Sequence, residues 1–289
     1  MDKETSAKIT GPDAAMLRAQ NILRDFETVD DLQCRGYYII QKEKGFKFGM
    51  DAVLLADFAT GAPGGRVMDL CSGTGVIPLL MHGRGKGAHF TGLEIQEEIA
   101  DMAQRSVVLN RLEEQVEMVC GNLCDIVKGR RSGNGDADET GEADDAEKIA
   151  RTIFERESFD AVTANPPYIK GGHGLTNAAS TKMISRHEVY MTLEDLVAAA
   201  AYLLKPGGTF AVVYKPFRLA ELITELAKAR LEPKRMCLVE PHAGEEPNMV
   251  LLEAVKYGKP YLNCEPTLVC YGSDGKYTEE LLSRYGGYY

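Results

Sequence analysis

Arg66-Val67-Met68-Asp69-Leu70-Cys71-Ser72-Gly73-Thr74-Gly75 decides the fold of this 289-residue chain. Its apolar first half predicts a buried strand, and a helix is expected to start at Gly75. Gly73 and Gly75 permit a tight turn and a close approach of the backbone to a ligand. Neither of the two common phosphate-binding glycine patterns is present, because the Gly-x-x-x-x-Gly-Lys-Ser/Thr pattern is absent and Pro78 stands where a third Gly would fall. The stretch predicts a cofactor loop of another kind, and the plain alternative is an ordinary strand-to-helix turn.

Outward from this loop, apolar strands and amphipathic helices alternate. This alternation predicts an α/β fold with a doubly wound, mainly parallel sheet. Two closing strands separated by few residues indicate one antiparallel member at the edge of the sheet. Lys205-Pro206-Gly207-Gly208 is expected to stop a helix. Strands are expected at 36–41, 66–70, 88–93, 116–120, 159–164, 210–214, 236–239 and 249–255, and helices at 51–58, 75–81, 96–110, 193–204 and 219–229.

Glu94 ends the second strand of this series, about twenty residues after the glycine loop. A carboxylate at that place can accept hydrogen bonds from both hydroxyls of a ribose. The acid alone does not choose between NAD and another adenosine-containing cofactor.

Asn165-Pro166-Pro167-Tyr168 follows the strand 159–164 directly. Two prolines stop the strand and stiffen the loop at its carboxyl end, where open α/β sheets bind their ligands. The Asn165 side-chain oxygen and the Pro166 carbonyl can both accept from one flat NH2 group, and Tyr168 offers a ring face for stacking. The plain alternative is a proline-rich turn.

The composition is that of a globular chain, with 44% hydrophobic and 26% charged residues. Ser132–Lys148 holds seven acidic residues and one basic residue, a net −6 of the total −10, which leaves −4 for the remainder. Because this window has almost no large apolar side chain, a disordered acidic insertion is expected at 130–150. No apolar run is long enough to span a bilayer. Seven scattered cysteines indicate reduced thiols, and Cys120 and Cys124 lack the spacing of a zinc site, so no metal is expected.

The two motifs together resemble class I methyltransferases that methylate an amino or amide nitrogen with S-adenosylmethionine. Over about residues 30 to 285 the chain is similar to the bacterial methyltransferases that form N6-methyladenine at position 37 of valine tRNA. The pieces that carry this resemblance, beyond the two motifs, are 46–56, 185–188, 214–219, 232–235 and 248–254. The acidic insertion departs from the family pattern.

The resemblance implies the class I methyltransferase fold, Rossmann-like, with a seven-stranded sheet. It implies S-adenosylmethionine as cofactor and Asn165, Pro166, Pro167 and Tyr168 as the catalytic motif. Asn122 stands where the family pattern often has an Asp near the adenine amine, which leaves that contact uncharged. The cofactor-binding residues implied are Phe48, Asp51, Asp69, Cys71, Gly73, Thr74, Gly75, Glu94, Ile95, Asn122 and Leu123.

The expected function is therefore methylation of an adenine N6 in the anticodon loop of a tRNA, in the cytoplasm, by a monomer or a homodimer. One alternative is methylation of a glutamine amide in peptide release factors. Those enzymes carry a longer helical amino-terminal domain and a Pro-Arg-Pro-Glu-type segment, and this chain has neither. Another alternative is a silent fold that only binds RNA or protein. Residues 1–30 are expected to form an extension and 31–289 the methyltransferase domain. Candidate phosphate contacts are Lys170, Arg186, Lys215, Arg218, Lys234 and Arg235, with a solvated surface role as the alternative for each.

Overall fold

The computed structural model describes residues 12–44, 47–126, 154–167 and 191–285. The expected acidic insertion at 130–150 lies outside the described residues, as do Tyr168, Lys170 and the segment 185–188.

A nine-stranded sheet forms the centre of the molecule, in the order β10-β8-β9-β7-β6-β3-β4-β5, with β11 also paired to β8. Seven strands were expected, and the two short strands β10 and β11, which both pair with β8, account for the difference. Neighbouring strands are parallel except at β9, which runs antiparallel to both β7 and β8. The predicted α/β fold with a mainly parallel, doubly wound sheet is confirmed. The antiparallel strand β9 lies between β7 and β8 because it pairs with both. The strands are β3 (Arg66–Leu70), β4 (His89–Glu94), β5 (Val116–Cys120), β6 (Phe159–Ala164), β7 (Leu204–Tyr214), β8 (Leu231–His242), β9 (Met249–Lys256), β10 (Asn263–Cys264) and β11 (Leu268–Tyr271).

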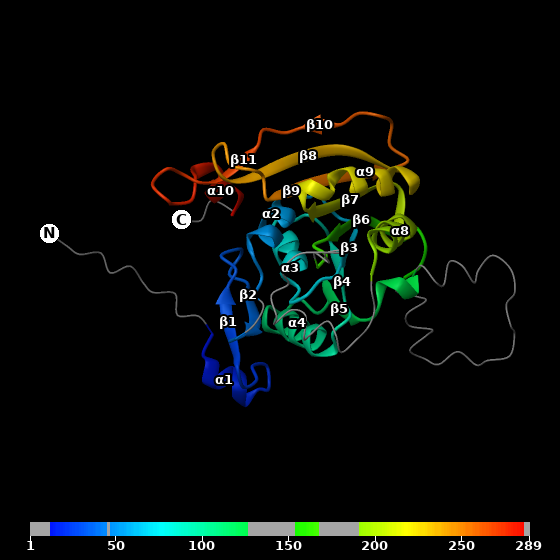
Figure 1. Ribbon diagram of the computed structural model, residues 1–289. Coiled ribbons are helices and arrows are strands. Elements are labelled where there is room, and N and C mark those ends of the chain that lie inside the picture. The colour runs from blue at the N-terminus through cyan, green and yellow to red at the C-terminus, as the bar shows by residue number, and fades with distance from the viewer. Residues whose placement is uncertain (1–11, 45–46, 127–153, 168–190, 286–289) are drawn as a thin grey trace, which may run out of the picture.

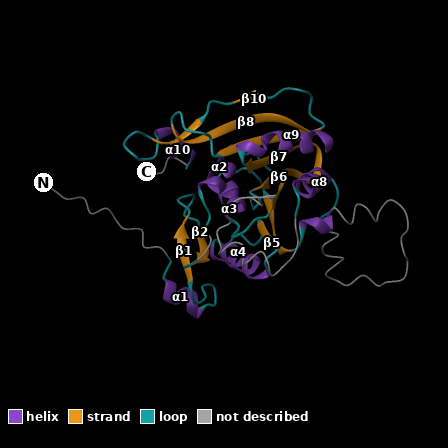
Figure 2. Ribbon diagram, in the orientation of Figure 1, coloured by secondary structure: helices purple, strands orange, loops and turns teal. Residues whose placement is uncertain are grey.

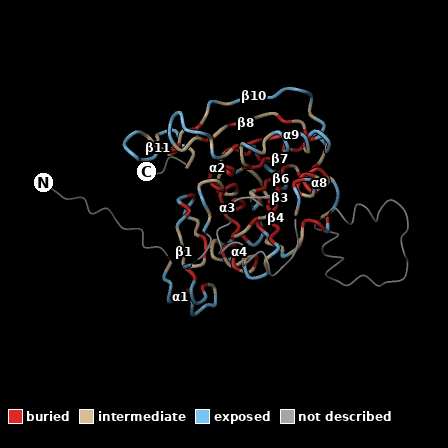
Figure 3. Tube along the Cα trace, in the orientation of Figure 1, coloured by how far each residue is buried: buried red, intermediate tan, exposed pale blue. Residues whose placement is uncertain are grey.

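Helices cover both faces of this sheet, as Figures 1 and 2 show. Alternate side chains of each strand point to opposite faces, which is why the central strands are apolar throughout. In β7, Val213 packs with α2 and α3, whereas Val212 packs with α8 and α9. Buried residues accordingly follow the central strands in Figure 3. The helices are α2 (Met50–Phe58), α3 (Val76–Gly83), α4 (Glu97–Leu109), α8 (Leu193–Leu203), η1 (Pro216–Arg218), α9 (Leu219–Lys228) and α10 (Glu279–Arg284).

The amino-terminal part packs against α4 through a small hairpin. It comprises α1 (Ala14–Ala19), β1 (Glu27–Asp31) and β2 (Tyr38–Lys42). Arg105 on α4 donates to both carboxylate oxygens of Glu27, each at 2.7 Å. Because β1 crosses residue 30, the division of the chain into 1–30 and 31–289 stays a proposal.

The start of β7 differs from the sequence prediction by six residues. The Pro206-Gly207-Gly208 stretch was expected to lie outside a strand, but β7 already begins at Leu204. Leu204 pairs with Phe159, and the register then shifts so that Thr209 pairs with Ala161. The extra residues form an irregularity in the ladder, where proline and glycine are tolerated.

Candidate active site

The loop between β3 and α3 has the left-handed backbone that its glycines permit. Gly73 has φ of +55°, Gly75 has φ of +79°, and Cys71 has φ of +59°. A Cβ on Gly75 would lie 3.4 Å from Met118 Sδ, an ordinary van der Waals distance, so the positive φ and not the packing favours glycine here. A Cβ on Gly73 would meet no atom of the described residues within 4 Å, so this side of the loop is open to a ligand.

Asp69 lies at the end of β3 with only 1% of its surface exposed. Its Oδ1 accepts a hydrogen bond of 2.6 Å from Thr163 Oγ1 on β6. Among the described residues, Asp69 Oδ2 and the buried Ser72 hydroxyl have no hydrogen-bond partner of normal geometry. Burial raises the pKa of Asp69 to about 7, against the lowering effect of Thr163 and Ser72, and the charge of Glu94 adds to the rise. A buried acceptor without a partner is costly, so Oδ2 fits a cationic or hydrogen-bonding group of a bound cofactor.

Glu94 supports the loop between β3 and α3, and only 5% of its surface is exposed. Its Oε2 accepts from the Gly73 amide at 3.0 Å, and its Oε1 accepts from the Gln96 amide at 2.9 Å. Glu94 Oε1 also accepts from Gln96 Nε2 at 3.3 Å. A carboxylate has about four acceptor sites, so Glu94 can take one ribose hydroxyl beside these three donors, and a second when the Gln96 side chain turns away. The residues present therefore fit an adenosine-containing cofactor.

The next two strands of the sheet bring further predicted residues to the same carboxyl edge. Ile95 follows β4 and is 43% exposed, which provides an apolar surface beside Glu94. Asn122 follows β5, and its Oδ1 accepts from the Cys124 amide at 3.0 Å, which caps the helical residues 123–126. Leu123 is buried in the apolar cluster under α8 and α9. Thr74 is buried within the loop itself.

The side chains of Asn165 and Asp51 meet at the carboxyl edge of the sheet. The Asn165 amide nitrogen donates to Asp51 Oδ2 at 3.0 Å. Asp51 stands in the first turn of α2, and Asn165 directly follows β6. Pro166 is buried and Pro167 is exposed. Because a carboxylate oxygen only accepts, the nitrogen of the Asn165 amide faces Asp51 and its oxygen faces away. The sequence did not predict this bond, since it placed Asp51 with the cofactor.

Strand pairing sets the two motifs side by side. Leu70 pairs with Ala164 in the parallel β3–β6 ladder, so Cys71 and Asn165 leave the sheet at the same level. The Cys71 sulfur is 3.7 Å from Met191 Sδ, just before α8. Burial raises the pKa of the Cys71 thiol, with Glu94 and Asp69 adding to the effect, so the thiol stays protonated. Phe48 packs its ring against the core beside α2, and its amide donates to Gln41 Oε1 at 3.0 Å.

The candidate phosphate contacts divide into two groups. Arg235 is committed to the fold, because its guanidinium donates to Glu253 at 3.1 Å and to Glu265 at 2.8 Å. Lys234 donates to the Lys259 carbonyl. Lys215 and Arg218 follow β7 at the carboxyl edge of the sheet, where Lys215 donates to the Asn248 carbonyl and Arg218 donates to Glu221.

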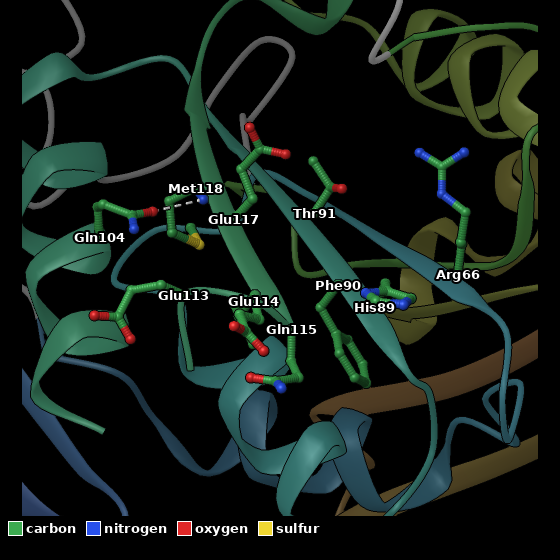
Figure 4. A pocket seen from close by; sticks show the side chains of 11 residues that line it. Arg66, His89, Phe90, Thr91, Gln104, Glu113, Glu114, Gln115, Glu117 and Met118 are labelled. Carbon is green, nitrogen blue, oxygen red and sulfur yellow. Dashed lines mark hydrogen bonds between the residues drawn. The ribbon is translucent and has the colours of Figure 1, made fainter. Parts of the chain in front are cut away.

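A cavity lies at the other end of the strands. It has a volume of about 570 Å³ and is bounded by the amino-terminal halves of β3, β4 and β5, as Figure 4 shows. Its lining residues include Arg66, His89 and Gln115, and none comes from the loops that carry Asp69, Glu94 or Asn165. This cavity is therefore separate from the candidate active site.

Within the described parts of the chain, no cluster of three or more His, Cys, Asp or Glu side chains is arranged to hold a metal ion. None of the described helices combines the length and apolar character that crossing a bilayer requires.

Comparison with known proteins agrees with this geometry. A protein named tRNA1(Val) (adenine(37)-N6)-methyltransferase from Porphyromonas gingivalis is 26% identical over 228 residues, which cover 78% of this chain and 80% of that protein. A protein of the same name from Aeromonas hydrophila is 24% identical and covers 88% of this chain and 94% of its own length. The chain is a relative of these tRNA methyltransferases. The resemblance drawn from its motifs is confirmed.

Two further comparisons concern the fold. Residues 88–215 match the model of the Eco57I restriction-modification methylase family. The crystal structure of a protein described as a predicted O-methyltransferase from Agrobacterium tumefaciens superposes with a TM-score of 0.59 at 21% identity. It covers 82% of this chain and 96% of that one. The fold is that of the class I methyltransferases.

Proposed function

We propose that this protein transfers a methyl group from S-adenosylmethionine to N6 of an adenine in tRNA, with adenine 37 of valine tRNA as the first candidate. The observation that carries the proposal is the hydrogen bond from Asn165 to Asp51. Asn165 opens the motif 165–168, called the acceptor motif from here on, which leaves the sheet beside the glycine loop. The names of the curated relatives support the choice of tRNA.

The cofactor would lie along the carboxyl ends of β3, β4 and β5. Glu94 would accept the ribose hydroxyls, Ile95 would contact the adenine ring, and Asn122 would lie near its amine. Asp69 Oδ2 would face the ammonium of the methionine part. When bound, S-adenosylmethionine supplies a methyl group on a positively charged sulfur.

Asn165 and Pro166 would bind the acceptor nitrogen. An adenine amine is a weak nucleophile because its lone pair is delocalised into the ring. Asn165 Oδ1 and the Pro166 carbonyl would accept its two N–H bonds and favour a tetrahedral nitrogen, as the N–C bond forms and the bond from the methyl group to sulfur breaks with its electron pair left on sulfur. Positive charge grows on that nitrogen in the transition state, so these fixed acceptors stabilise it more than the ground state. The nitrogen then loses one proton to water.

Asp51 acts in this scheme as a positioning residue. By accepting from Asn165 Nδ2, its carboxylate turns Asn165 Oδ1 toward the substrate, and the orientation is set before the base arrives. Tyr168, which lies outside the described residues, would stack on the base, and Pro167 would hold the loop stiff.

A tRNA substrate implies a cytoplasmic location, which we propose on that ground. The release-factor alternative is not favoured by the names of the relatives. Nucleoside analysis of tRNA from cells lacking this protein tests the proposal. We expect loss of one N6-methyladenosine, restored by the wild-type gene and not by Asn165→Ala. An unchanged nucleoside profile would contradict the proposed function.

A further inference from the structure

Phe217 is a large apolar side chain that the fold leaves in solvent. It is 77% exposed, in the short turn η1 that directly follows β7. No other described residue of β7, η1 or α9 is a large exposed apolar side chain. A single exposed ring, with no second large exposed apolar side chain on these described elements, differs from a protein interface, which has an apolar centre.

The turn stands beside the acceptor motif. Ala164 pairs with Val212 in the parallel β6–β7 ladder, so Asn165 leaves the sheet beside β7. β7 continues for two more residues, Val213 and Tyr214, which still pair with β9, and Phe217 follows three residues after the strand ends. The ring therefore lies at the same carboxyl edge of the sheet as Asn165, on the neighbouring strand exit.

The turn is held in place on both sides of the ring. Lys215 Nζ donates to the Asn248 carbonyl at 3.2 Å. Arg218 makes two hydrogen bonds of 2.7 Å to Glu221, and its guanidinium lies 5.2 Å from the centre of the Tyr214 ring. Pro216 fixes the backbone at the first position of the turn. An aromatic ring presented on a fixed turn loses little freedom when it binds.

We propose that Phe217 stacks on an unpaired base of the RNA substrate next to the base that enters the active site. This inference rests on the proposed function. A base offers a flat face that matches a single exposed ring, and stacking needs no other apolar contact. The phenyl ring offers neither charge nor hydrogen-bond donor to a phosphate, and Glu245 and Glu246, in the same loop as Asn248, add negative charge.

Four variants test the proposal with unmodified tRNA as the probe. Phe217→Ala and Phe217→Leu remove the aromatic face, whereas Phe217→Trp keeps it. Tyr261→Ala is the matched control, because Tyr261 is 73% exposed but lies between β9 and β10, at the amino-terminal end of β8. We expect Phe217→Ala and Phe217→Leu to raise the Kd and the KM for tRNA about 5- to 100-fold. Phe217→Trp and Tyr261→Ala should change them less than threefold.

Two further measurements separate stacking from other roles. The Kd for S-adenosylmethionine should be the same in all four variants. The slope of log Kd against log salt should not change in Phe217→Ala, because a lost stack releases no counterion. Tight binding by Phe217→Ala, or equal binding by the Leu and Trp variants, would overturn the stacking role while leaving the proposed function intact. If the wild-type protein neither binds nor methylates tRNA, both the proposed function and this inference fail.

Discussion

Asn165 and Asp51 are 114 residues apart in sequence, and the amide of one donates to the carboxylate of the other at 3.0 Å. The bond joins the loop after β6 to the first turn of α2. It links the motif that would receive the substrate to a segment that the sequence had placed with the cofactor.

Replacing Asp51 should therefore affect turnover more than cofactor binding. We expect Asp51→Ala to lower kcat about 10- to 100-fold, because Asn165 loses the partner that orients its amide. Asp51→Asn should keep more activity, since its side-chain oxygen still accepts from Asn165. Steady-state kinetics and a titration with S-adenosylmethionine measure both effects. A loss of cofactor affinity equal to the loss of kcat would indicate instead that Asp51 binds the cofactor.

The buried carboxyl of Asp69 predicts a pH dependence of stability. Its pKa is about 7 in the folded protein, against an ordinary value of 3.8. Between these two pH values the folded protein binds a proton that the unfolded chain has lost, so the free energy of unfolding falls as the pH rises. The loss is at most about 4 kcal/mol. Asp69→Asn should remove it, since the Asn oxygen still accepts from Thr163. Denaturant titrations of both proteins without cofactor, at pH 5 and pH 8, measure the free energy of unfolding. The same change between the two pH values in the wild-type protein and in Asp69→Asn would refute the prediction.

The same carboxyl predicts a pH dependence of cofactor affinity. An ammonium bound beside Asp69 Oδ2 favours the charged carboxylate, so binding releases a proton. Affinity for S-adenosylmethionine should therefore rise between about pH 6 and pH 8 in the wild-type protein, while Asp69→Asn should bind more weakly with a flat profile. Calorimetry in buffers of different ionisation enthalpy measures the released proton directly. Identical profiles of affinity against pH for the two proteins would show that the ammonium of the cofactor does not bind beside Asp69 Oδ2.

Glu94 is expected to act on the loop as well as on the ribose. Glu94→Ala removes the acceptor for the Gly73 and Gln96 amides and should lower the free energy of unfolding by about 1–3 kcal/mol. The same change should also lower the affinity for S-adenosylmethionine. Glu94→Gln keeps one side-chain oxygen and should recover part of both. Thermal melting and a cofactor titration measure the two effects. A folded Glu94→Ala protein with wild-type cofactor affinity would count against the assignment of this site.

The central strands were predictable because each is a short apolar run that must be buried on both faces. β3, β5 and β6 begin and end at the predicted residues. The ends of β7 and β8 were less predictable, since pairing with neighbouring strands extends both beyond their apolar segments. Proline and glycine near the start of β7 indicated a stop, but the ladder with Phe159 continues through them.

The acceptor motif and the glycine loop were visible in the sequence because each is a local pattern. Their meeting with other residues was not. Nothing local in the sequence pairs Asp51 with Asn165, or Thr163 with Asp69, since these bonds depend on how distant elements pack. Arg235 was a candidate for phosphate contact, and its network with Glu253 and Glu265 became visible only in the fold.

Methyl transfer to tRNA by the purified protein tests the central claim most directly. With methyl-tritiated S-adenosylmethionine and tRNA from cells lacking the protein, we expect label on N6 of one adenosine. Asn165→Ala should bind the cofactor with wild-type affinity and lose most of the transfer rate, because the lost acceptor serves mainly the transition state. Label on a release-factor glutamine with none on tRNA, or full activity of Asn165→Ala, would contradict the proposed function and mechanism.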